Sequence, residues 1–196
     1  MSYNFETYLR QQITNINQTK IDNDFNRILG LCIKIINSFE SGGTLAFIGN
    51  GGSAAEANHL AAEFTGKCLL EHKPLKAISL CENTSSLTAI ANDFGNEFIF
   101  SRQVEALLDS NSILIAMSTS GSSGNVLTAI KMARELGIYT VLWTGQKFLL
   151  TSDTNVADEV WIAPTPSTPR IQEIHLMWGH LVAECVELYF ASVDGK

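Results

Sequence analysis

The sequence lacks long hydrophobic runs and carries little positive charge. No apolar stretch approaches the ~18 consecutive residues of a membrane-spanning helix, so we expect no membrane span. Lys and Arg total 13 against 20 Asp and Glu, and the net charge of −7 disfavours non-specific binding to nucleic acid or anionic membranes. The N-terminal stretch MSYNFETYLRQQ is polar and lacks the apolar core of a signal peptide. We therefore expect a cytoplasmic protein.

Paired cysteine motifs are also missing. The four cysteines, Cys32, Cys68, Cys81 and Cys185, are scattered without a C-x-x-C pair, which favours free and mostly buried thiols. No internal repeat, low-complexity segment or linker interrupts the 196 residues, and 45% of them are hydrophobic. The chain therefore suits one domain with a packed core, together with an added N-terminal helical piece.

The order of apolar and helical patterns predicts an α/β fold. Residues 3–39 hold no convincing strand, whereas short apolar runs alternate with helical segments after Gly43. This alternation is typical of a parallel sheet covered on both faces. We predict a doubly wound, mostly parallel sheet flanked by helices over residues 41–196, with residues 1–40 as a helical extension that packs on the domain or in an oligomer. The expected strands are TLAFIGN (44–50), KAISL (76–80), SILIAMS (112–118), IYTVLWTG (138–145) and EVWIA (159–163).

The first expected strand runs into GNGGSA, residues 49–54, which matches the dinucleotide-binding pattern G-x-G-x-x-A. That pattern also requires an acidic residue about 20 positions later, at the end of the second strand. The nearest candidate, Glu82, lies too far along, so dinucleotide binding is disfavoured. A tight strand-to-helix turn with Ser53 as the helix cap is expected in any case, and it leaves room for a ligand.

Two further loops follow in the sequence. In STSGSSGNV, residues 118–126, hydroxyl groups cluster where a strand gives way to a helix, whose free N–H groups and partial positive charge suit a phosphate. A capped loop with solvated hydroxyls is the alternative. Asn92 and Asp93 precede Gly95, and an Asx-turn is the favoured local interpretation there. The hydroxyl-bearing candidates are Ser118, Thr119, Ser120 and Ser123.

Two helices carry the remaining candidates. His59 and Glu63 are four residues apart, a spacing that suits two ligands of a metal or a proton-transfer pair, although ordinary helices also carry such pairs. In the last expected helix, His180 lies among apolar residues, where a hydrogen-bonded core histidine is the plainer interpretation. Gln172 and His180 are eight residues apart, about 12 Å along a helix. Both reach one small site more easily if one comes from a neighbouring subunit or if Gln172 precedes the regular helix.

Together these segments resemble the sedoheptulose 7-phosphate isomerase (phosphoheptose isomerase) family, whose members carry the sugar isomerase (SIS) domain. The resemblance begins near residue 20 and covers most of the chain. The stretches that carry it are GNGGSAAEANHLAAEF, LTAIANDFGNEFIFSRQVEALL, STSGSSGNV and RIQEIHLMWGHLVAE.

This resemblance implies an enzyme that interconverts sedoheptulose 7-phosphate and D-glycero-D-manno-heptose 7-phosphate through an enediol. The reaction is the first step toward the activated heptose of bacterial surface polysaccharides such as lipopolysaccharide. The resemblance also implies a homotetramer with active sites between subunits. Glu63 and His180 match the acid–base pair, and one zinc ion per subunit is implied at His59, Glu63, Gln172 and His180. The implied sugar contacts are Asn50, Gly51, Gly52, Ser53, Glu63, Asn92, Asp93 and Gln172, and the implied phosphate contacts are Ser118, Thr119, Ser120 and Ser123.

Several positions depart from the family pattern. Asn58 stands where glutamine is frequent, and Pro169 where an acidic or small residue is usual. Lys67 and His72 stand where the family usually has arginine, and lysine lacks the forked geometry that suits phosphate oxygens. These departures affect the expected phosphate and hydroxyl contacts and leave the acid–base pair intact.

Two other functions fit the same fold. One related SIS tetramer binds the bacterial replication initiator without catalysis, but it lacks the catalytic glutamate and the second histidine of the last helix. This chain has both Glu63 and His180, which favours the enzyme. A module that senses a phosphosugar is the second alternative, and no appended DNA-binding segment supports it.

Overall fold

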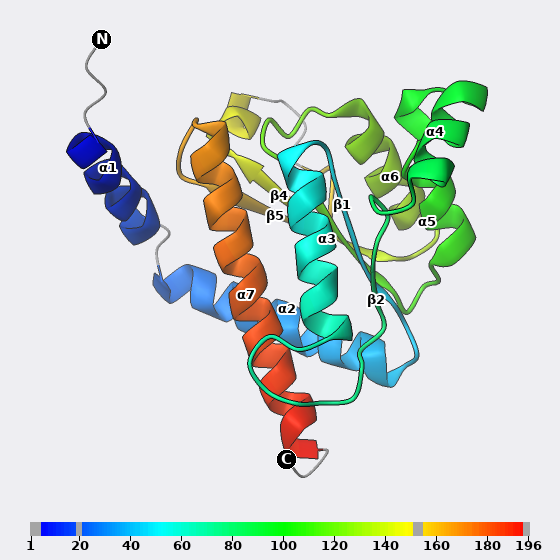
Figure 1. Ribbon diagram of the computed structural model, residues 1–196, viewed down its shortest axis with the longest axis horizontal. Helices are drawn as coiled ribbons and strands as arrows, with labels where there is room; N and C mark the ends of the chain where they lie inside the picture. Colours follow the sequence, from blue (N-terminus) through cyan, green and yellow to red (C-terminus); the bar gives the residue numbers. More distant parts are fainter. Residues whose placement is uncertain (1–4, 19–20, 151–154, 194–196) are drawn as a thin grey trace.

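The computed structural model describes residues 5–18, 21–150 and 155–193, which form an α/β sandwich (Figure 1). The two N-terminal helices precede the first strand, and from there strands and helices alternate as the sequence predicts. The helices are α1 Phe5–Gln18, α2 Ile21–Glu40, α3 Gly52–Thr65, α4 Thr84–Asp93, α5 Ser101–Leu107, α6 Gly124–Glu135 and α7 Thr168–Val193, with short 3-10 turns η1 Asn96–Phe98 and η2 Gln146–Leu150. The strands are β1 Leu45–Gly49, β2 Ala77–Ser79, β3 Ile113–Ser118, β4 Tyr139–Gly145 and β5 Glu159–Ala163.

Within the described residues the five strands pair in the order β2-β1-β3-β4-β5, and every pair is parallel. The strand order reverses direction between β1 and β3, the place where doubly wound sheets collect ligands beyond the carboxyl ends of their strands. Every residue of β1 and β3 is buried, which is why both read as continuous apolar runs. The predicted doubly wound parallel sheet is confirmed.

Helices cover both faces of this sheet. α3 packs on β1 and β2 and also contacts α7, which in turn contacts α2, while α6 packs on β3 and β4 and contacts α5. Figure 1 shows α3 and α7 side by side, away from the group formed by α4, α5 and α6. The core between these layers includes Phe47, Leu114 and Trp143, each at most 1% exposed.

The N-terminal helices differ in how they join the domain. Leu31, Cys32 and Ile35 of α2 are completely buried in the common core. α1 extends away from the sheet in Figure 1, and Gln12 on it donates a hydrogen bond to Glu173 on α7. The division of the chain at residue 40 stays a prediction. The four cysteines are free thiols, and no helix in the described part of the chain is both long and apolar enough to cross a membrane.

Candidate active site between helices α3 and α7

The turn from β1 into α3 is built for close approach. Gly51 has a φ of 55°, a conformation that favours glycine, and a Cβ at Gly52 would overlap the side-chain amide of Gln172 on α7. Gly51 is also the N-cap residue of α3. The prediction that Ser53 caps this helix is therefore wrong: the glycine turn starts the helix two residues earlier, and Ser53 lies buried in the first turn.

The loop from β3 into α6 gathers its hydroxyl groups by hydrogen bonds among themselves. Ser118 Oγ lies 3.0 Å from Ser123 Oγ and accepts a hydrogen bond from the backbone N–H of Gly121 at 3.1 Å. Ser120 Oγ accepts from the hydroxyl of Ser122 at 2.9 Å. These serines extend from Ser118, the last residue of β3, to Ser123, the N-cap residue of α6, where the first backbone N–H groups have no partner within the helix. The loop can thus offer several donors to one anion.

The β1–α3 and β3–α6 loops are joined by a pair of asparagines. Asn50 Nδ2 donates to Asn125 Oδ1 at 2.9 Å, and Asn125 Nδ2 donates back to Asn50 Oδ1 at the same distance. Sequence reasoning missed Asn125. Its position directly after Ser-Ser-Gly, in the first turn of α6, is the signal that could have directed attention to it.

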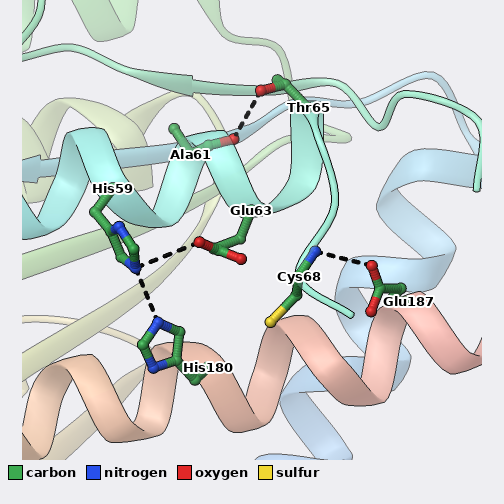
Figure 2. A network of polar contacts seen from close by, with 7 residues as sticks. All are labelled: His59, Ala61, Glu63, Thr65, Cys68, His180 and Glu187. Carbon is green, nitrogen blue, oxygen red and sulfur yellow. Dashed lines mark hydrogen bonds and ion pairs between the residues drawn. The ribbon is translucent and has the colours of Figure 1, made fainter. Parts of the chain in front are cut away.

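His59, Glu63 and His180 come together in one chain. His59 Nε2 lies 2.9 Å from His180 Nε2 and 3.3 Å from Glu63 Oε1 (Figure 2). One donor atom from each of the three residues lies within 4.8 Å of the other two. The His59 side chain is 47% exposed and that of Glu63 is 17% exposed, so a ligand has access to the cluster.

The packing of α3 against α7 produces this convergence. The two helices run side by side in the same direction (Figure 1), with Gly52 against Gln172 near their starts and His59 against His180 two turns later. Next to the second of these contacts, a Cβ at Gly179 would overlap the side chain of Leu60. The missing side chain at Gly179 lets the helices approach closely, directly beside His180.

Gln172 does not join this cluster within one chain. It lies in the second turn of the regular helix α7, which begins at Thr168, and its amide packs on Gly52. About two turns of helix separate it from His180. One of the two arrangements that would bring Gln172 and His180 to one site requires Gln172 to precede the regular helix. That arrangement is absent, because α7 is already regular at Gln172.

Asn92 and Asp93 lie at the end of α4, where the Asn92 amide donates to the Asp93 carboxylate at 2.8 Å. Asp93 lines a cavity of about 560 Å³ formed by residues of β2, α4 and α5, whose lining includes Glu82 and Arg102. None of the three cluster residues lines that cavity. The single chain thus holds the α4 pair and the α3–α7 cluster in separate surroundings.

The segment after α3 lies beside the cluster and is anchored by α7. Both carboxylate oxygens of the buried Glu187 accept backbone hydrogen bonds, from Cys68 at 2.9 Å and from Leu69 at 2.8 Å, and His72 Nε2 lies 3.3 Å from the same carboxylate. Figure 2 shows the Cys68 thiol directed toward Glu63 and His180. Burial and then the hydrogen bond to Glu63 raise the pKa of Cys68 to about 12, so this thiol stays protonated and can donate to Glu63.

Two other titratable groups are buried near these helices. Burial raises the pKa of Glu56 on α3 to about 7, an effect that the nearby Ser53 hydroxyl only partly offsets. Burial lowers the pKa of His175 on α7 to about 4, and this imidazole stacks on Trp178 with ring centroids 5.6 Å apart. The core histidine of the last helix is therefore His175, whereas His180 is half-buried and faces His59.

Comparisons with known proteins show the family to which the chain belongs. The SIS domain family matches residues 7–145. A phosphoheptose isomerase of Helicobacter pylori (strain Shi470) is 46% identical over 158 residues, 81% of each chain, and a probable phosphoheptose isomerase of Thermoplasma acidophilum is 40% identical over 88% of this chain and 94% of its own. The solved structure of the Neisseria gonorrhoeae phosphoheptose isomerase superposes with a TM-score of 0.82 at 32% identity, covering 93% of this chain and 96% of its own.

These relatives are 32–46% identical to the chain over most of their length. The same chain carries the turn into α3, the loop into α6 and the cluster of His59, Glu63 and His180. The chain belongs to the phosphoheptose isomerase family of SIS domain proteins.

Proposed function

We propose that this protein is an aldose–ketose isomerase that converts sedoheptulose 7-phosphate into D-glycero-D-manno-heptose 7-phosphate in the cytoplasm. The convergence of His59, Glu63 and His180 within 4.8 Å carries the proposal, because the reaction needs a base at carbon and a proton carrier at oxygen in one place. The named relatives support the substrate, since those at 40–47% identity are phosphoheptose isomerases.

In the proposed reaction Glu63 removes a proton from C1 of the ketose and returns it to C2. His180 takes the proton of the O1 hydroxyl and delivers one to O2, so that carbonyl and hydroxyl exchange places. The position of Glu63 suits the base role, because its carboxylate is only 17% exposed and lies 3.3 Å from His59 in the same cluster. The Cys68 thiol would hold Glu63 in place by donating to it.

The donor set of the cluster fits zinc. Imidazole nitrogens and a carboxylate oxygen are common zinc ligands, and tetrahedral bonds of about 2.0–2.1 Å put neighbouring ligand atoms about 3.3 Å apart. The His59–His180 and His59–Glu63 separations of 2.9 and 3.3 Å are close to that value. When bound, zinc would polarise the sugar carbonyl and stabilise negative charge on its oxygen. In the proposal, Gln172 of another subunit supplies the remaining protein ligand, since the chain's own Gln172 packs on Gly52.

The remaining candidates hold the substrate in this proposal. Backbone N–H groups and hydroxyls of the β3–α6 loop bind the phosphate without needing lysine or arginine, as at other helix N-termini. Asn50, Gly51 and Gly52 contact the sugar, and Ser53 lies below them in the first turn of α3. Asn92 and Asp93 on α4, which lie apart from the cluster within one chain, contact the sugar in the assembled oligomer, where the active sites lie between subunits. The phosphate contacts are Ser118, Thr119, Ser120 and Ser123.

Assembly into a homotetramer is part of the same proposal. Leu9, Ile13 and Ile16 form an exposed apolar stripe along α1, and Leu29 and Ile33 form another on α2. A second copy of the chain would bury both stripes. Light scattering should give a mass near four chains, and Ile13→Glu should lower it while Asn17→Glu on the same helix should not. A wild-type protein that stays monomeric at working concentration contradicts this part of the proposal.

One assay tests the function. Purified protein is incubated with sedoheptulose 7-phosphate, with and without added zinc, and the aldoheptose 7-phosphate is detected by NMR. Formation of the product supports the isomerase. If there is no conversion under either condition, the alternatives are a tetramer that binds the replication initiator and a phosphosugar sensor. Calorimetry with sedoheptulose 7-phosphate separates them, because only the sensor must bind the sugar.

A further inference from the structure

The Asn50–Asn125 pair is held in one orientation by a third group. Asn125 Oδ1 accepts a hydrogen bond from the backbone N–H of Val126 at 2.9 Å, in addition to the one from Asn50 Nδ2. A backbone N–H can only donate, so the oxygen of Asn125, and not its nitrogen, must face Val126. The amide nitrogen of Asn125 is thereby directed at Asn50.

This orientation determines that of Asn50. Rotating the Asn50 amide by half a turn would set nitrogen against nitrogen and oxygen against oxygen, replacing two hydrogen bonds by two repulsive contacts. Asn125 is only 6% exposed, whereas Asn50 is exposed. Asn50 therefore keeps one N–H and one oxygen lone pair in fixed directions on the accessible side of the pair, an arrangement that matches a sugar hydroxyl, which both donates and accepts.

We infer that Asn125 is a positioning residue, which fixes the Asn50 amide for the sugar and couples the sugar loop after β1 to the phosphate loop after β3. The inference rests on the proposed role of Asn50 as a sugar contact. The two loops follow neighbouring strands, since β1 pairs with β3 over its whole length. Asn125 lies two residues after Ser123 in the chain, so an anion held by the serine loop is linked to Asn50 through one buried side chain.

The test is a double-mutant cycle between the two asparagines. Asn125→Asp keeps the size of the side chain and can accept from Val126 and Asn50, but it cannot donate to Asn50 Oδ1. We expect it to raise the KM for sedoheptulose 7-phosphate about tenfold, as the loss of one well-formed hydrogen bond would. Because Asn125→Asp also adds a negative charge near the serine loop, the inhibition constant of inorganic phosphate, which reports that loop alone, is compared in Asn125→Ala, where it should change less than twofold.

The decisive comparison uses a protein that already carries Asn50→Ala. If Asn125 acts through Asn50, Asn125→Asp and Asn125→Ala should raise KM no further in that background. An equal increase in both backgrounds overturns the inference, as does an unchanged KM in the protein with Asn50 intact. A general loss of stability would instead raise both the KM and the inhibition constant of phosphate, or lower the melting temperature, whether or not Asn50 is present. Asn37→Ala, on the exposed face of α2, serves as the matched control.

The proposed function is tested separately in the same experiment. Turnover by the wild-type protein reports the isomerase, whereas the cycle reports the positioning role. If the wild type does not turn over, the same cycle is measured as the dissociation constant of sedoheptulose 7-phosphate by calorimetry. The same tenfold loss, absent in the Asn50→Ala background, is expected there, and additive losses again overturn the inference.

Discussion

The Nε2 atoms of His59 and His180 lie 2.9 Å apart, across the interface of two helices that are far apart in the sequence. Two imidazole nitrogens at this distance cannot both present a lone pair, so a proton or a cation must lie between them. Glu63 Oε1, 3.3 Å from the same atom of His59, adds negative charge to the pair. The arrangement therefore favours binding of a positive charge at this point.

Zinc binding should depend on His59. Replacing it with alanine removes one of the three clustered donors, and we expect zinc affinity to fall by more than about 100-fold, since even groups that only support ligands contribute 10–100-fold. Competition with a chromophoric chelator measures the affinity, and elemental analysis the content. Asn58→Ala, on the exposed surface one residue earlier, should bind zinc like the wild type. Equal affinity in both variants would contradict the metal site.

Replacing Glu63 by glutamine should abolish turnover and leave the fold intact. The change removes the carbon base while keeping the shape of the side chain, and general bases typically contribute 10²–10⁴-fold to rate. We expect kcat to fall by at least about 100-fold, with circular dichroism and the melting temperature nearly unchanged. Near-normal kcat in this variant would exclude Glu63 from the base role.

Replacing Gly179 with alanine should both destabilise the protein and disturb the cluster of His59, Glu63 and His180. The added Cβ would overlap the fully buried Leu60, and overpacking of this kind costs about 1–3 kcal/mol of unfolding free energy. Urea unfolding measures the loss for Gly179→Ala. Gly30→Ala on α2 is the control, because no atom lies within 4 Å of its new Cβ and alanine favours helix by about 0.5–1 kcal/mol. Wild-type stability and zinc affinity in Gly179→Ala would show that α3 and α7 need no such close approach.

Glu56 should make the protein less stable as pH rises. Its pKa is raised from 4.5 to about 7 by burial, so the folded state binds more protons than the unfolded state between these values. Stability then falls as pH increases through this window, and the full penalty, on the order of 2–3 kcal/mol, is present above pH 7. Glu56→Gln should remove this slope. Urea unfolding at pH 5 and pH 8 tests it: a gain from the substitution that is the same at both values would refute the explanation.

His175 should act in the opposite direction. Its pKa is lowered from 6.5 to about 4 by burial, so the unfolded state binds more protons between these values and stability falls as pH decreases through that window. His175→Gln, which stays neutral, should flatten the acid limb of the stability profile between pH 6.5 and 4. If stability falls equally in the wild type and the variant between pH 6.5 and 4, His175 gains its proton without unfolding of the protein.

Hydrophobic pattern was sufficient to predict the sheet. All five strands lie within the predicted runs, because a parallel sheet covered on both faces requires continuous apolar segments that polar turns interrupt. The start of α3 was misassigned because serine is the commoner cap, whereas the turn at Gly51 depends on a backbone angle that sequence does not display.

The features that the sequence did not predict are contacts between segments far apart in the chain. The pairing of Asn125 with Asn50, and of His72 with Glu187, joins residues 75 and 115 positions apart, and neither pair has a spacing that reveals it. The approach of His59 and His180 depends on the absence of a side chain at Gly179, a position that looks like any other helix residue in the sequence. The resemblance to a family supplied the candidate site residues, and the packing of α3 on α7 explains why His59 and His180 meet.

Helix α7 carries three of these groups in succession: Gln172 against the glycine turn, His180 against His59, and Glu187 holding the segment that bears Cys68. They are spaced by eight and seven residues, about 2.2 and 1.9 turns, so all three emerge within about 80° of one another, toward α3 and the chain that follows it. A translation or rotation of α7 would displace all three side chains at once. Evolution cannot tune these three contacts independently by moving the helix; only exchange of individual side chains can separate them.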